Sequence, residues 1–564
     1  MITLLLAAVH AGAQTEKTEA PDVATVSGSI QSDMLFPQTD EAIGAVKDGS
    51  FNTNTYADIL LQSRYVDGGA RYEYLDHPLP GFEQDFKGFG LPNAWLKLKV
   101  KEHSLTVGTF YEQFGSGFIL RSYEERSLGI DNSLLGARLV VKPFKGVTLK
   151  ALTGKQRRYW QWNESLISGA DAELNLDEWI GSMQRRGVRL MLGGSWVNKY
   201  EKEDESIFTD ATHRLNVPKY VNSWDVRAQL NVGNLSVLAE YAQKTDDPNY
   251  YNGYIYKKGN AAMLSASYSK SGLSLLLQAK RSENMASVSR RKENSTYSAS
   301  AVNHLPAFTL DHTYALAALY PYATQLTDGE WAYQAEVAYN FRRRTLLGGK
   351  YGMNVKVNFS YVRSIQRDFV DGQDRRTIAG QMALAGTDGY RSSFFKWGDH
   401  TYYQDLDVTV SRRLSRDFKL TLMYMNQRYN QLQIQQHGDM IHSNIFVGEG
   451  LWQLAPKTRL RFELQYLQTK QDEGDWLYGL VELSLAPHWM FTLSDMWNVG
   501  DSDPLQHARN THYHYYQGLV TYNIGAHRIQ AGYRRTREGI NCSGGVCRVI
   551  PAQRGFTLSY NYNF

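Results

Sequence analysis

Apolar and polar residues alternate with a period of two along much of the chain, and the final segment shows the pattern most clearly. One of its faces is apolar and aromatic, with Phe556, Leu558, Tyr560, Tyr562 and Phe564; the other is polar, with Thr557, Ser559, Asn561 and Asn563. Successive side chains of a strand point to opposite faces, so the pattern predicts a strand between an apolar medium and water. A soluble β-sandwich could also contain one such strand.

Charged residues occupy the polar face of other alternating segments. Residues 459–466 place Arg459, Arg461 and Glu463 on one face and only apolar or aromatic side chains on the other. The dry core of a sandwich would not accept three charges, because burying unpaired charge is costly. A wide hydrated lumen would accept them, and the apolar face would then meet lipid. The repetition therefore predicts an all-β protein, a transmembrane antiparallel β-barrel.

Tight turns alternate with much longer connections. The turns are expected at residues 102–103, 145–146, 233–234, 271–272, 416–417, 456–457, 487–488 and 525–526. The longest connections are expected at residues 161–169, 202–222, 289–330 and 366–400. Short periplasmic turns and long extracellular loops are typical of outer-membrane barrels. Strands of about ten residues give about 24 strands, with roughly 22 or 26 as alternatives, starting at residues 23–35 and including residues 170–180.

The N-terminus carries an export signal. Residues 1–13, MITLLLAAVHAGA, form an apolar stretch that ends in small residues, the pattern of a signal peptide cut before Gln14. Residues 14–22 would be a short periplasmic segment, with no room for the plug domain of a TonB-dependent transporter. No linker or change of composition divides residues 23–564, which we expect to form a single barrel domain.

Composition agrees with strands as the spanning elements. The chain has 37 Tyr, 12 Trp and 47 Gly but only 14 Pro, and aromatic residues favour strands. Its mean hydropathy is negative, as expected when polar lumen residues alternate with lipid-facing ones. Beyond the first dozen residues no apolar run is long enough for a transmembrane helix. A net charge of +4 and the absence of a basic helix argue against nucleic acid as a partner.

Few residues suggest bond-making or metal chemistry. Cys542 and Cys547 are the two cysteines, and in an exported chain we expect them to form a disulfide in the extracellular loop before the last strand. They make a poor zinc site, since two further ligands are missing nearby. His512 and His514 lack a third ligand for a metal ion. No nucleophile elbow is present, although catalytic residues that are separated in the sequence would not be visible. We expect no catalytic residue, no metal and no cofactor.

The segment at residues 114–135 interrupts the strand pattern and concentrates charge. Its candidate lumen-constriction residues are Arg121, Tyr123, Glu124, Glu125, Arg126 and Asp131. In porins, a loop after an early strand commonly folds into the barrel, where opposed charges set a field across the narrowest point. The alternative is a solvated extracellular loop whose charges pair with each other or with the barrel wall. The second charged group expected to face the lumen is Arg459, Arg461 and Glu463.

Basic and aromatic clusters have two interpretations each. Two arginine groups, Arg342, Arg343 and Arg344, and Arg534, Arg535 and Arg537, could meet phosphates of lipid or lipopolysaccharide, or could simply be solvated. Aromatic residues near strand ends could form interfacial girdles or a carbohydrate-stacking surface. These residues are Trp95, Trp476, Trp489, Trp497 and Tyr562.

Three runs of residues resemble one family. GTFYEQFGSGFILRSYEERSLGIDNSLLGARLVVKP (108–143), HTYALAALYPYA (312–323) and FFKWGDHTYYQDLD (394–407) are similar to outer-membrane barrels of Bacteroidota that carry a domain-of-unknown-function label. The resemblance covers the mature chain, and Gln14 after the cleavage site is similar to other exported Bacteroidota proteins. It implies the barrel fold and the outer-membrane location, and it assigns no catalytic or binding residue.

The pattern as a whole favours a non-enzymatic, porin-like channel of the cell outer membrane, which passes or binds solutes through a charged lumen. The alternative is an accessory barrel in a multiprotein outer-membrane assembly, for secretion, barrel insertion or surface-protein handling; an outer-membrane hydrolase comes third. Expected partners are membrane lipid, lipopolysaccharide, other outer-membrane proteins and the insertion machinery. That machinery would read Tyr560, Tyr562 and Phe564 as the insertion signal.

Overall fold

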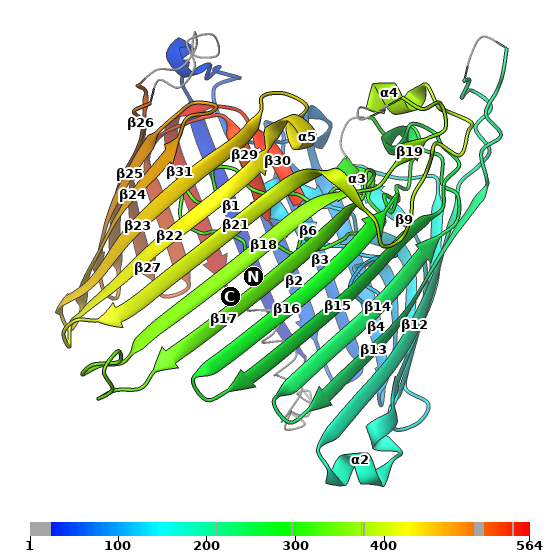
Figure 1. The fold of residues 1–564 in the computed structure, drawn as a ribbon, viewed down its shortest axis with the longest axis horizontal. Helices are drawn as coiled ribbons and strands as arrows, with labels where there is room; N and C mark the ends of the chain where they lie inside the picture. The colour runs from blue at the N-terminus through cyan, green and yellow to red at the C-terminus, as the bar shows by residue number, and fades with distance from the viewer. Residues whose placement is uncertain are drawn as a thin grey trace.

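One antiparallel sheet runs through the described chain and closes on itself as a barrel (Figure 1). The computed structural model describes residues 24–209, 212–294, 297–373, 375, 378–500, 512–543 and 546–564. The signal peptide expected at residues 1–13 and the segment at 14–22 lie outside the described residues.

The wall of the barrel has 24 strands. The sheet contains 25 strands, and one of these, β10 (Gln161–Trp162), only extends the end of its neighbour β9. The wall strands are β1 (Thr25–Pro37), β2 (Asn52–Gln62), β3 (Val66–Leu75), β4 (Gly88–Val100), β5 (His103–Phe110), β8 (Leu134–Val141), β9 (Val147–Arg158), β11 (Leu166–Asn175), β12 (Val188–Tyr200), β13 (Tyr220–Val232), β14 (Leu235–Lys244), β15 (Gly259–Lys270), β16 (Leu273–Glu283), β17 (Glu330–Phe341), β18 (Met353–Ile365), β21 (Trp397–Arg413), β22 (Phe418–Asn430), β23 (Met440–Ala455), β24 (Thr458–Thr469), β25 (Trp476–Leu485), β26 (Trp489–Asn498), β27 (His514–Ile524), β28 (His527–Thr536) and β31 (Gln553–Asn563). The fold class and strand number predicted from the sequence are confirmed.

The barrel closes where the last strand meets the first. β31 pairs antiparallel with β1, from Gly555 opposite Pro37 to Asn563 opposite Ser29. The two predicted faces of this strand are confirmed. Inside, the Ser559 hydroxyl donates to the Asp33 carboxylate at 2.6 Å, whereas Phe556 is exposed on the outside.

The two ends of the barrel differ in the length of their connections. At one end, called here the turn end, each predicted tight turn joins two neighbouring wall strands. Its longer connections are residues 342–352 and residues 176–187, which carry η4 (Leu176–Glu178) and α2 (Gly181–Arg185). The strand predicted at residues 170–180 is therefore placed too late, because β11 starts at Leu166 and residues 176–178 already form η4.

The opposite end, called here the loop end, carries the long connections and most of the small elements (Figure 1). These elements are η1 (Glu41–Ile43), η2 (Gln84–Phe86), η5 (Tyr250–Asn252), β19 (Asp368–Phe369), α4 (Ile378–Met382), β20 (Tyr390–Arg391), α5 (Gln431–Gln435), β29 (Gly539–Ser543) and β30 (Val546–Ile550). Cys542 and Cys547 face each other across the β29–β30 hairpin and form a disulfide.

Side chains alternate between an apolar outer face and a polar inner face. On β24, Leu464 is 68% exposed on the outside, while the neighbouring Glu463 is 3% exposed on the inside. Trp489 and Trp497 also face outward, as a girdle requires. No helix in the described ranges is long and apolar enough to cross a membrane.

Two of the predicted girdle residues face the other way. Trp476 is 1% exposed and belongs to the hydrophobic cluster inside the barrel. Trp95 lies on the inner face of β4, since its neighbours Leu96 and Leu98 are exposed outside, and its indole covers Gly69 of β3. The girdle interpretation of Trp476 and Trp95 was wrong, because closeness to a strand end does not reveal which face a residue takes.

Candidate functional site: two segments inside the barrel

The first inner segment, residues 111–133, leaves β5 at the loop end and folds into the barrel. It contains β6 (Glu124–Glu125), η3 (Arg126–Leu128) and β7 (Ile130–Asp131). Phe114, Phe118 and Leu120 are at most 1% exposed and share a hydrophobic cluster with the wall. Wall residues of this cluster include Leu152, Ile167, Val197, Ala242 and Ala261. The segment is therefore packed within the lumen and is not a solvated surface loop.

The tip of the first inner segment reaches across to β14. The backbone N–H and the hydroxyl of Ser116 donate to Glu240 Oε2 at 3.0 and 2.7 Å. Gly117 has a φ of +95°, and a Cβ there would lie 3.2 Å from the carbonyl oxygen of His304. Only glycine adopts this conformation without strain while allowing so close an approach.

The charges near the end of the first inner segment pair with the wall. The Glu124 carboxylate accepts two hydrogen bonds from Arg71 of β3, at 2.6 and 3.0 Å. Arg126 donates to Asp58 of β2 at 2.9 Å. An arginine–carboxylate pair joined by two hydrogen bonds is stronger than a singly bonded pair, and it also fixes the relative orientation of the two groups. These contacts fasten the segment to the adjacent strands.

A further buried network continues from β7 to β9. Arg157 is 1% exposed and donates to Asp131 of the first inner segment at 2.6 Å, and to both Glu73 carboxylate oxygens at 3.0 and 2.7 Å. Arg157 thus joins the segment to β3 and β9 at once.

The other predicted constriction residues make local contacts. The guanidinium of Arg121 lies 4.3 Å from the ring centroid of Tyr123, a cation–π geometry. Burial raises the pKa of Tyr123 to about 12. Glu125 accepts from the backbone N–H and hydroxyl of Ser127, which caps η3. All six predicted residues therefore lie in one segment inside the barrel; a charge field across an open pore stays a prediction.

The second inner segment, residues 284–329, connects β16 to β17 and contains α3 (Tyr297–Ser300). From the sequence, residues 289–330 were expected only to form a long connection. Its side chains are among the most buried of the described chain: Met285, Val302, Leu305, Phe308, Leu316, Leu319, Tyr320 and Tyr322. The apolar character of residues 304–323 was a usable signal, because a solvated loop does not need so many large apolar side chains.

Lysines of the wall hold the first half of the second inner segment. Lys199 Nζ donates to the carbonyl of Val288 at 2.8 Å, and Lys244 Nζ donates to the carbonyl of Ala286. Both ammonium groups also contact the Asp247 carboxylate, at 2.7 and 3.3 Å. One carboxylate therefore neutralises part of the charge of the two buried lysines, and both ammonium groups also donate hydrogen bonds to the backbone of the segment.

The two inner segments are also bonded to each other. The N–H of Arg121 donates to Val302 O at 2.9 Å, and the N–H of His304 donates to Gly117 O at 3.0 Å. The Asn303 side-chain amide donates to Phe118 O at 2.8 Å. Because these bonds lie in the same region as the shared hydrophobic cluster, the two segments form one packed body inside the lumen.

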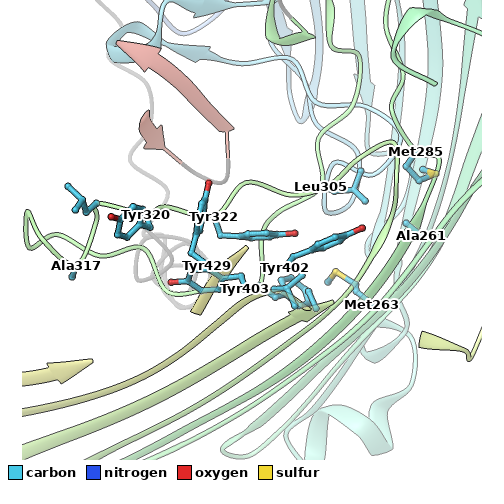
Figure 2. Packing of buried hydrophobic residues seen from close by; sticks show 14 of the residues in the cluster. Ala261, Met263, Met285, Leu305, Ala317, Tyr320, Tyr322, Tyr402, Tyr403 and Tyr429 are labelled. Carbon is cyan, nitrogen blue, oxygen red and sulfur yellow. The ribbon is translucent and has the colours of Figure 1, made fainter. Parts of the chain in front are cut away.

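The second half of the second inner segment binds the wall at strands further along the sheet, β22 and β24. The N–H of Leu316 donates to Gln465 Oε1 of β24 at 2.8 Å, and Gln427 of β22 donates to Tyr320 O at 3.1 Å. Figure 2 shows Tyr320 and Tyr322 of the segment beside the wall tyrosines. Ring centroids are 5.7 Å apart for Tyr320 and Tyr429, and 5.4 Å apart for Tyr322 and Tyr403.

Buried phenols and an ion pair complete this attachment. Burial raises the pKa of Tyr320 and Tyr322 well above the ordinary value, so both phenols stay protonated and act as donors. Tyr320 donates to Asp472 at 2.9 Å, and Tyr322 donates to Glu330. Glu330 also pairs with Lys280 at 2.8 Å, with both side chains fully buried.

Leu316→Ala is expected to lower the free energy of unfolding by about 2–5 kcal/mol, because Leu316 is fully buried and the vacated space would leave a cavity. Urea unfolding in lipid vesicles measures the change. Leu346→Ala is the matched control, since Leu346 is 99% exposed in a turn. Equal losses in the two variants would contradict tight packing of the segment.

A cavity of about 860 Å³ opens on the turn-end side of the second inner segment. Residues 310–314 of the segment line it, together with inward residues of the wall. Among the wall residues, Lys356 pairs with Glu336 at 2.8 Å. His312 Nε2 lies 3.0 Å from Asp405 Oδ2 of β21.

The predicted lumen charges on β24 face inward. Arg461 pairs with Glu449 of β23 at 2.9 Å and also with Glu463. Arg459 contacts the side chain of Gln453 at 3.2 Å and is more exposed. The three-charge face is therefore mostly paired, and the neighbouring Gln465 holds the second inner segment.

The remaining basic and histidine clusters lie away from the two inner segments. Arg342, Arg343 and Arg344 are exposed in the turn after β17. Arg535 pairs with Asp40 at 2.7 Å, and Arg534 donates to Gln553 at 2.6 Å, both at the loop end. Arg537 lies 3.9 Å from Glu473. Contacts of either cluster with phosphates stay a prediction.

His514 faces outward and forms a pair with Asp495 at 2.6 Å. In the part of the chain that the structure describes, no group of three or more His, Cys, Asp or Glu side chains is placed to hold a metal ion.

The sequence of the chain matches one family over its whole length. Residues 1–564 match the family described as Family of unknown function (DUF6029). The chain belongs to DUF6029. No curated protein matches it. The two inner segments are thus features of a DUF6029 barrel for which the family description supplies no activity.

Solved outer-membrane barrels resemble the DUF6029 barrel only distantly. The siderophore receptor PirA from Pseudomonas aeruginosa is 10% identical, with 96% of this chain and 81% of the receptor covered and a TM-score of 0.41. The translocation pore of the P pilus usher PapC is 10% identical, with coverage of 96% and 99% and a TM-score of 0.44. OccAB3 from Acinetobacter baumannii is 10% identical, with coverage of 96% and 99% and a TM-score of 0.35. Similarities at this level of identity and TM-score say nothing about what the DUF6029 barrel does.

Proposed function

We propose that this protein is a porin-like channel of the bacterial outer membrane, held in a constricted state by its two inner segments. The apolar outer face and the closed sheet support a place in a bilayer. In a closed barrel the backbone N–H and C=O groups of every strand are hydrogen-bonded to neighbouring strands, and no sheet edge is left exposed to lipid. The loop end would be extracellular and the turn end periplasmic. Lipid and lipopolysaccharide would be its surroundings, and an origin in Bacteroidota stays a prediction.

One observation carries the proposal. The inner wall formed by β25 to β28 and β31 presents polar side chains that are partly exposed to solvent, including Glu482, Gln517, Gln530 and Asn561. The polar contacts of the two inner segments reach the wall from β1 to β24, and their hydrophobic cluster includes Trp476 of β25 and Tyr515 of β27 near the loop end. A hydrated strip of wall beside a packed body would give small polar solutes a route, and its charges would select among them.

An accessory barrel is the second candidate, and a different observation favours it. The two inner segments bury a hydrophobic cluster that extends over much of the barrel interior. An interior filled in this way suits a barrel that serves as a scaffold for other outer-membrane proteins. Its long connections at the loop end would then be docking surfaces.

Planar bilayer recording with Glu482→Lys tests the channel. The wild-type protein is expected to give discrete openings, and Glu482→Lys is expected to shift the ion preference toward anions, because the lumen strip loses a carboxylate and gains an ammonium group. Glu203→Lys is the matched control, since Glu203 is exposed in a loop-end connection and pairs with Lys219 outside the wall.

A folded protein that gives no openings, and that co-purifies with fixed partners, would overturn the channel in favour of the accessory barrel. Openings whose ion preference is the same in Glu482→Lys and in the wild type would place the conducting route elsewhere than this strip.

A further inference from the structure

The cavity on the turn-end side of the second inner segment contains an unsatisfied carboxylate. Asp407 of β21 lines this cavity and is 1% exposed. Its Oδ1 accepts from the Thr409 hydroxyl at 3.1 Å. Its Oδ2 has no hydrogen-bond partner among the described residues. A buried polar atom without a partner is costly, and such an atom marks a place where a ligand can supply the missing contact.

The neighbouring carboxylates differ from Asp407 because each is already bonded. Asp405 accepts from the N–H of Ser360 at 2.9 Å and from Tyr403 at 3.1 Å, and His312 is 3.0 Å away. Glu336 is paired with Lys356. The carboxylate that a ligand could satisfy is therefore Asp407, and the remaining acid of the cavity is Asp311, exposed on the second inner segment.

We propose that this cavity binds a small organic cation, with a primary ammonium group that donates to Asp407 Oδ2. An anion is disfavoured beside Asp407, since Asp311 and Asp407 would repel it; the basic residue Arg189, which also lines the cavity, lies at the turn-end start of β12. A directly coordinated metal ion needs several ligands, and no such group exists among the described residues. An ammonium group needs only acceptors within hydrogen-bond reach, and a charge-assisted bond to a carboxylate is among the stronger ones.

The rest of the cavity suits the carbon part of such a ligand. Leu276, Leu310 and Met423 contribute apolar surface, and Ser236, Ser267 and Ser274 contribute hydroxyl groups. A volume of about 860 Å³ falls within the usual range for small-molecule sites. The site lies on the turn-end side of the second inner segment, so a cation bound there would contact the segment that the channel must move or bypass.

The ammonium group could belong to a free solute or to a lysine side chain of another protein, and two pairs of probes distinguish these sources. Glucosamine is compared with glucose, and a capped Gly-Lys-Gly peptide is compared with its acetyl-lysine form. Calorimetry on the detergent-solubilised barrel measures each affinity. Binding needs no conductance, so it can succeed or fail independently of the proposed channel.

At least one amine is expected to bind at least about tenfold more tightly than its neutral match, and Asp407→Asn is expected to remove that preference. Asp33→Asn is the matched control, because Asp33 is an inward carboxylate that is already bonded to Ser559. The amine should also raise the melting temperature of the wild type but not of Asp407→Asn. Preference for glucosamine identifies a free solute, and preference for the peptide identifies a lysine side chain.

Equal affinity for each amine and its neutral match would overturn the proposal. So would an Asp407→Asn variant that melts as the wild type does without ligand and still prefers the amine.

Discussion

Replacing residues 309–321 by a glycine and serine stretch of equal length is expected to raise the single-channel conductance severalfold. The replacement removes the Leu316 side chain, which is buried in the hydrophobic cluster of the lumen, and the Tyr320 ring, which packs against Tyr429 of β22. A flexible stretch of the same length can still connect its ends, but it no longer gains energy from burial in the lumen. Planar bilayer recording gives the conductance, and swelling of protein-containing liposomes in sugars of increasing size gives the new cut-off.

A replacement of equal length at residues 383–395 is the control. These residues follow α4 at the loop end, where Leu384 and Tyr390 form a small cluster separate from the one in the lumen (Figure 1). This control is expected to leave conductance close to that of the wild type. If the lumen replacement folds and inserts but conducts as the wild type does, the second inner segment does not limit passage.

Arg157→Met is expected to lower the free energy of unfolding by about 3–5 kcal/mol, because removing one partner of a buried ion-pair network leaves the other charges uncompensated. Arg157 is 1% exposed, and it bonds Glu73 of β3 and Asp131 of the first inner segment. Urea unfolding in lipid vesicles measures the loss.

Two comparisons distinguish loss of charge pairing from loss of packing. Arg214→Met removes an exposed arginine that pairs with Glu205, and its cost is expected to stay below about 1 kcal/mol. Adding Glu73→Gln and Asp131→Asn to Arg157→Met should recover most of the lost stability, since no unpaired charge remains. A triple variant as unstable as Arg157→Met would assign the cost to packing.

The first inner segment shows how far local sequence could predict the site. Its charges and its break in the strand pattern marked residues 114–135 as special, and all of the named residues lie inside the barrel. Their partners could not be predicted, because Arg71, Asp58 and Arg157 lie on strands that are distant in sequence and meet the segment only in the closed barrel.

The second inner segment was missed for a related reason. Its length and its apolar residues 304–323 were visible, but a surface loop and an inward segment have the same flanking strands. The difference depends on hydrogen bonds between the backbone of Leu316 and Tyr320 and the side chains of Gln465 and Gln427. These glutamines lie more than a hundred residues further along the chain.

The sequence by itself determined the strand period, the approximate strand number, the alternation of turns and loops, and the closing strand, because these depend on neighbours along the chain. It also placed Leu464 outside and Glu463 inside. Only the tertiary structure decided which connections fill the lumen, which way Trp476 points and which carboxylate lacks a partner. Those features depend on pairings across the barrel, and such pairings exist only after the sheet has closed between β31 and β1.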